Sequence, residues 1–196
     1  MTVFQIIMLA ATGFFAYKMY EHIQSLEDSD ATPQRDSHPS TAAAVQSVTA
    51  ETLLDEADKA FEEGDMQAAK RLLLEAQTKD EKHIDILRKL GFIAAKEGQL
   101  DEAIEYYDKA LTIDSQDDMV HNAIASIYRQ QGEFEKAREH YEKAIAIDPN
   151  YEVSYFNFAN LLVDMQELEA AKRMYKKALE IDPELMQAKF ELEKLS

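Results

Sequence analysis

The chain has 196 residues, no cysteine, and 38 acidic against 21 basic side chains, which give a formal net charge of −17. The absence of cysteine excludes a disulfide framework, a thiolate metal site and a lipoprotein anchor. The acidic balance argues against nucleic-acid binding, which needs clustered cations to replace the counterions of the phosphates. Residues 49–196 hold 33 of the acidic and 19 of the basic residues, which indicates a solvated surface that could also attract basic partners.

The first predicted element is a hydrophobic segment at residues 1–20. Between Val3 and Tyr20 the only charged residue is Lys18. As a helix these 18 residues span roughly 27 Å, close to the hydrocarbon thickness of a bilayer. A cleaved signal peptide would carry Lys or Arg before the apolar run, and an interfacial helix would carry a charged face. We therefore expect a single transmembrane anchor, and the positive-inside rule applied to Lys18 places the rest of the chain in the cytoplasm.

Residues 21–48 form the predicted linker. The segment is acidic and rich in Ser, Thr and Pro, with Pro33 and Pro39 as helix breakers. It has few apolar groups to bury, so we expect it to be disordered and to act as a tether.

A period of 34 residues organises the rest of the chain. Gly64, Gly98 and Gly132 are each 34 residues apart, and Gln166 holds the fourth place in the series. Such a period is typical of stacked helix pairs, because a single pair cannot bury its apolar face alone. Gln166 is expected to adopt a backbone conformation that glycine adopts at lower cost, in a slightly altered turn.

Three places in each unit hold small residues, which let helix backbones approach closely. They are Ala57, Gly91, Ala125 and Ala159; Ala69, Ala103, Ala137 and Ala171; and Ala76, Ala110, Ala144 and Ala178. Two further places hold larger groups that are predicted to fill the space between the layers. They are Leu73, Tyr107, Tyr141 and Tyr175, and Met66, Leu100, Phe134 and Leu168.

Two features concern the ends of the units. Glu56 stands where the later units have Leu90, Ile124 and Phe158, as suits a terminal repeat with nothing stacked on that side. The pairs Asp148-Pro149 and Asp182-Pro183 are predicted to start helices, because Asp can cap free N–H groups and Pro is tolerated at the first helical position.

This pattern resembles the tetratricopeptide repeat (TPR) family over roughly residues 50–183. The resemblance implies an all-α, right-handed superhelical solenoid of four helix-turn-helix repeats, at about 50–83, 84–117, 118–151 and 152–185. Residues 184–196 are predicted to form the capping helix of a TPR domain that covers residues 49–196. Proteins of this family bind other proteins on a concave face and seldom carry chemistry of their own.

In this family the first helix of each unit lines the concave groove. The positions that match are Arg88, Lys89, Phe92, Lys96, Asn122, Ser126, Arg129, Phe156, Asn157 and Asn160. Asn can pair with both N–H and C=O of an extended peptide, and Arg can hold a carboxylate through two hydrogen bonds. The alternative is that the cations are ordinary solvated helix charges and that the Phe rings are packed between helices. The family's carboxylate clamp is not reproduced, because Asp55 and Asp58 occupy its places in the first unit.

No catalytic constellation emerges from the sequence. The five histidines are scattered without a metal-ligand pair at helix spacing, and the repeats account for the glycines other than Gly13, leaving no phosphate-binding loop. We expect no enzyme activity, no cofactor and no metal.

The sequence favours a membrane-tethered scaffold or adaptor that binds a protein or peptide. The alternative is an assembly or quality-control factor for an envelope complex, as in cytochrome maturation, with the repeats outside the cytoplasm. A protein that is exported with loss of its first 20 residues and an organelle import receptor also stay open. So does homo-oligomerisation, with the capping helix of one copy in the groove of a neighbour.

Overall fold

The computed structural model describes residues 48–195. The predicted anchor at residues 1–20 and nearly all of the predicted linker lie outside this range. Among the described residues, no helix is long and apolar enough to cross a membrane.

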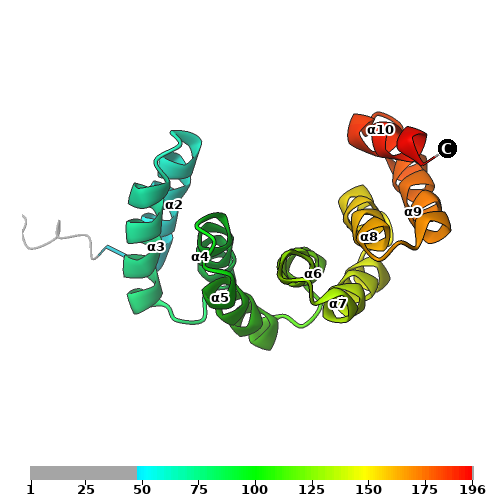
Figure 1. The fold of residues 1–196 in the computed structure, drawn as a ribbon. Coiled ribbons are helices and arrows are strands. Elements are labelled where there is room, and N and C mark those ends of the chain that lie inside the picture. Colours follow the sequence, from blue (N-terminus) through cyan, green and yellow to red (C-terminus); the bar gives the residue numbers. More distant parts are fainter. Residues whose placement is uncertain (1–47, 196) are drawn as a thin grey trace, which may run out of the picture. The chain divides into compact units, whose positions relative to one another are not determined.

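The described chain is a series of helices with no strand, joined by short turns (Figure 1). The helices are α2 (Ala50–Glu62), α3 (Met66–Lys79), α4 (Ile84–Lys96), α5 (Leu100–Ile113), α6 (Asp118–Gln131), α7 (Phe134–Ile147), α8 (Glu152–Asp164), α9 (Leu168–Ile181) and α10 (Met186–Lys194). They pack as consecutive antiparallel pairs along an arc, with α4, α6 and α8 on its inner side. The all-α solenoid predicted from the repeat is confirmed for residues 48–195.

The small residues make the close helix contacts that the sequence predicts. The alanines at these places, from Ala57 to Ala178, are completely buried. Gly91 shows why the side chain must be small, because a Cβ atom added there would lie 2.7 Å from Cε1 of Tyr107. Ordinary carbon contacts need about 3.5 Å or more, so the Tyr107 ring occupies the space that a methyl group would take.

The larger groups divide into two classes. Leu73, Tyr107, Tyr141 and Tyr175 are buried as predicted. The other series is only partly buried, and Leu168 is 41% exposed. The prediction that this second series fills the interior is therefore wrong for Leu168, which is the first residue of α9 and lies at the edge of its helix pair. At the start of the array, Glu56 is exposed, in agreement with its terminal position.

The turn inside each repeat requires a left-handed residue. Gly64, Gly98 and Gly132 have φ between 78° and 79°, and Gln166 has φ 63°. In the fourth turn the N–H of Glu167 donates to the carbonyl of Leu162 at 2.8 Å, and the corresponding bond in the second turn, Gln99 to Ala94, has the same length. Gln166 thus takes the glycine conformation, as expected, and the turn keeps its hydrogen bond.

The prediction that Asp-Pro pairs start helices is wrong. Asp148 and Asp182 are the C-terminal caps of α7 and α9. Their carboxylates accept a hydrogen bond from the backbone N–H two residues on, at Asn150 and Glu184. This is the Asx turn that Asp forms with its own backbone, and it closes one repeat before the next helix begins.

Arg88 links the second repeat to the third. The carboxylate of Asp117 accepts a hydrogen bond from the N–H of Val120 at 3.0 Å and so caps α6. The Asp117 side chain is only 3% exposed, and its other oxygen is 3.0 Å from a guanidinium nitrogen of Arg88. Arg88 also donates to Asp85 on its own helix. The buried cap of α6 is therefore neutralised from α4.

We expect Gln166→Gly to raise the free energy of unfolding by roughly 0.5–1 kcal/mol, because a left-handed backbone strains residues with a Cβ atom. Gly98→Gln should lower it by a similar amount. Urea denaturation followed by far-UV circular dichroism measures both changes. A neutral or destabilising Gln166→Gly substitution would contradict the strain.

We expect Arg88→Gln to destabilise the repeats by about 1–3 kcal/mol, because it leaves a buried carboxylate without its cation. The matched control is Lys89→Gln, which breaks a more exposed ion pair and should cost less than about 1 kcal/mol. Urea denaturation of the two variants tests the difference, and equal losses would show that the Arg88–Asp117 contact is not structural.

Candidate functional site

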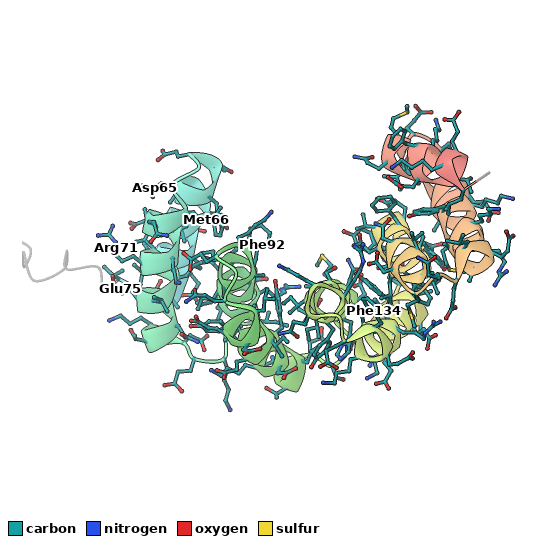
Figure 2. All side chains as sticks on the ribbon, viewed as in Figure 1. Asp65, Met66, Arg71, Glu75, Phe92 and Phe134 are labelled. Carbon is teal, nitrogen blue, oxygen red and sulfur yellow. The ribbon has the colours of Figure 1, made fainter. Side chains whose placement is uncertain are left out.

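The concave side of the first three repeats contains an apolar hollow of about 450 Å³, between α2, α4 and α6. Its lining residues are Phe61, Asp85, Arg88, Lys89, Phe92, Tyr107, Met119, Val120 and Ala123. Phe92 and Met119 are 43% and 53% exposed (Phe92 is labelled in Figure 2). Two large apolar side chains thus reach solvent inside a concave surface, which is where a ligand side chain can be buried.

Most of the predicted groove cations already have carboxylate partners. Arg88 pairs with Asp85 and Asp117, as described above. Lys89 lies 2.6 Å from Asp58 on α2, and Arg129 pairs with Asp164 on α8. These pairs join neighbouring repeats, so they neutralise the groove and hold its walls together.

Lys96 differs from the other predicted cations. Its Nζ atom lies 5.5 Å from the centroid of the Phe92 ring. No carboxylate within residues 48–195 forms an ion pair with it. Among the four predicted cations, Lys96 is therefore the one whose charge is open to a ligand.

The predicted polar residues form a row between α6 and α8. The amide nitrogen of Asn157 donates to the amide oxygen of Asn122 at 3.3 Å. Ser126 donates to the backbone carbonyl of Asn122 at 3.0 Å, and the Tyr175 hydroxyl donates to the amide oxygen of Asn160. Asn122 is buried, whereas Asn157 and Asn160 are half-buried. The amide oxygen of Asn157 and the amide nitrogen of Asn160 remain available for a peptide backbone.

The two predicted aromatic residues have different environments. Phe92 is exposed and its ring centroid lies 6.3 Å from that of Phe61. Phe156 is half-buried, packs against the core of the last two repeats and lies 5.8 Å from Tyr175. Phe92 is thus the better candidate to receive an apolar ligand side chain, and Phe156 mainly supports the fold.

Two contributions were absent from the sequence prediction. Met119 lines the hollow, although it stands at the second place of the third unit, a place that faces the ligand in this family. That positional signal was available in the sequence. The other is the pair His121 and His140, whose Nδ1 atoms lie 3.1 Å apart.

The histidine pair is buried between α6 and α7. Loss of solvation is the main cause that lowers the pKa of both rings, and for His140 the pKa falls to about 4, with further contributions from His121 and Lys143. Both rings are therefore neutral at pH 7. No group of three or more His, Cys, Asp or Glu side chains that could hold a metal ion occurs in the described part of the chain.

Comparison with known proteins supports the repeat and the fold. The crystal structure of MamA protein has 24% sequence identity and a TM-score of 0.66, covering 76% of this chain and 81% of that one. PilF of Pseudomonas aeruginosa has 22% identity and a TM-score of 0.68, covering 74% and 67%. At these identities the similarity establishes the fold alone.

A third structure is the first TPR of Spaghetti (RPAP3) bound to the HSP90 peptide SRMEEVD. It has 30% identity and a TM-score of 0.56, covering 59% of this chain and 90% of that one. No curated protein matches the chain. The family model for the tetratricopeptide repeat matches residues 83–150 and 117–184. These spans together cover more than half of the sequence, and the chain therefore belongs to the tetratricopeptide repeat family.

Proposed function

We propose that this protein is a membrane-tethered scaffold that captures a protein or peptide segment in the concave groove of its repeats. The observation that carries the proposal is the hollow in which Phe92 and Met119 are exposed. TPR proteins mediate protein–protein interactions, and the domain at 30% identity holds a peptide. We propose no catalytic activity.

The groove favours a ligand with a large apolar side chain. Burial of such a side chain contributes about 1.5–3 kcal/mol, and the hollow offers Phe61, Phe92 and Met119 as its contacts. Asn157 and Asn160 would hold the extended backbone beyond it. Asp58 lies where the family's clamp has a residue that binds carboxylate, and it pairs with Lys89. A peptide that binds through its terminal carboxylate in the family's usual pose is therefore disfavoured.

The membrane tether rests on residues 1–20, and the repeats are proposed to face the cytoplasm. Scaffold function at a cytoplasmic membrane surface and assembly of an envelope complex then differ in the side of the membrane on which the groove lies. The positive-inside rule and Lys18 favour the cytoplasmic side.

We expect the double substitution Phe92→Ser with Met119→Ser to weaken the binding of peptides by on the order of tenfold. The peptides are selected on the wild-type full chain from a random display library, and their affinities are measured by fluorescence anisotropy. Asn157→Ala with Arg129→Ala should also weaken binding, because it removes polar groups beyond the hollow.

The matched control is Ile113→Ser, which removes an apolar side chain of the same exposure, 43%, outside the hollow. All variants should keep the wild-type helical signal and melting temperature. If peptide affinities stay at the wild-type level in the Phe92/Met119 variant, the hollow is not the binding site.

Because the chain has no cysteine, Ser196→Cys and Ser37→Cys each create a single labelling site for a membrane-impermeant maleimide. We expect both variants to fractionate with membranes, and neither to be labelled in intact cells before lysis. Removal of residues 2–20 should release the protein from the membrane fraction. Labelling of intact cells, with any outer membrane permeabilised, would place the repeats outside and favour the envelope-assembly function.

A further inference from the structure

The C-terminal helix α10 has an apolar face that no other helix of residues 48–195 covers. Met186 and Phe190 are 63% and 59% exposed. They are four residues apart, so they lie on the same face of the helix. The opposite face packs on the last repeat through Ala188, Leu185 and Leu192. Met186 and Phe190 are therefore not needed to attach α10 to the array.

The same chain carries a concave surface of matching chemistry. The hollow between α2, α4 and α6 exposes Phe92 and Met119. Apolar side chains at positions i and i+4 of a short helix are the anchors with which helices bind hydrophobic grooves. A helix of nine residues is about 13 Å long, so it can present both anchors to a hollow of this size.

The charges beside the two surfaces are complementary. Lys189 precedes Phe190, and Lys194 lies 4.1 Å from the centroid of the Phe190 ring. Around the hollow, Arg88 is shared by two carboxylates, Asp85 and Asp117, which leaves one negative charge in excess.

Helix α2 adds carboxylates on the other wall. Asp55 and Glu62 form no ion pair within residues 48–195, and Lys96 offsets one of these charges. The hollow is therefore apolar with net negative charge beside it, and the exposed face of α10 is apolar with lysines beside it.

The contact must join two molecules. Helix α10 packs on α9 at the C-terminal end of the arc, whereas the hollow belongs to the first three repeats (Figure 1). If α10 moved to its own hollow, Ala188, which is fully buried, and the side chains packed around it would be exposed. A second copy can meet the hollow without such a loss.

We propose that helix α10 of one copy docks in the hollow of a second copy, with Phe190 and Met186 buried against Phe92, Phe61 and Met119. The lysines of α10 then face the carboxylates of α2 and α4. The docked helix occupies the proposed peptide site, so self-association regulates the access of a partner. This regulatory consequence rests on the proposed function, whereas the contact between copies does not.

Crosslinking between single cysteines tests the contact in the full chain, solubilised in detergent. One copy carries Met119→Cys and one epitope tag, and the other carries Phe190→Cys and a second tag. A short bismaleimide should join the two tags in the mixture, while each variant alone should give little product. Adding Phe92→Ser to the Met119→Cys copy should reduce the yield by on the order of tenfold.

The control adds Leu74→Ser to the Met119→Cys copy, because Leu74 is similarly exposed and lies outside the hollow. This change should leave the yield at the level of Met119→Cys alone. Absence of product in the mixture, equal product from Phe190→Cys alone, or a yield insensitive to Phe92→Ser would each overturn the proposal. The crosslinking needs no partner, so its outcome is independent of peptide capture.

Discussion

The array depends on how closely neighbouring helices can approach. Eleven of the twelve small places in the four repeats are alanine and one is Gly91, and the alanines are completely buried. A larger group at any of these places would separate two helices and shift every helix beyond them. The close spacing fixes the turn inside each repeat, which is why Gln166 adopts the left-handed conformation of the glycines rather than a longer turn. Repetition of one spacing places α4, α6 and α8 on the inner side of the arc, and this produces the concave surface.

The walls of that surface are joined mainly by charge pairs between repeats. Lys89 reaches Asp58, Arg88 reaches Asp117 and Arg129 reaches Asp164, each across to a neighbouring first helix. Because these cations are already neutralised, binding an anionic ligand through them would require a structural ion pair to break. The exposed apolar side chains carry no such cost. The groove therefore selects a ligand by apolar shape first and by charge at its edges second.

The sequence predicts most of the fold because the fold is periodic. The 34-residue spacing identifies the helix pairs, the small residues identify the close contacts, and Glu56 identifies the exposed end. Interactions outside the period were missed. Asp148 and Asp182 have the residue type of a helix start, but their backbone position makes them Asx turns at a helix end. His121 and His140 are 19 residues apart, and only the packing of α6 on α7 brings them together. The partners of Arg88 and Lys89 likewise depend on stacking between repeats, which a position within one repeat does not define.

The concave hollow and the C-terminal face are linked by how the solenoid ends. A repeat array must finish with a helix that has nothing beyond it, and a polar outer face is the usual solution. Here the first repeat follows that solution at Glu56, whereas α10 keeps Met186 and Phe190 outside. A net charge of −17 opposes random association of copies, so the apolar end is tolerable only if its contacts are specific. Under the proposed tether, copies share a membrane plane, and confinement raises their effective concentration without any new contact. A docking contact that is weak between free molecules would then be populated, and a partner would have to displace it to reach the groove.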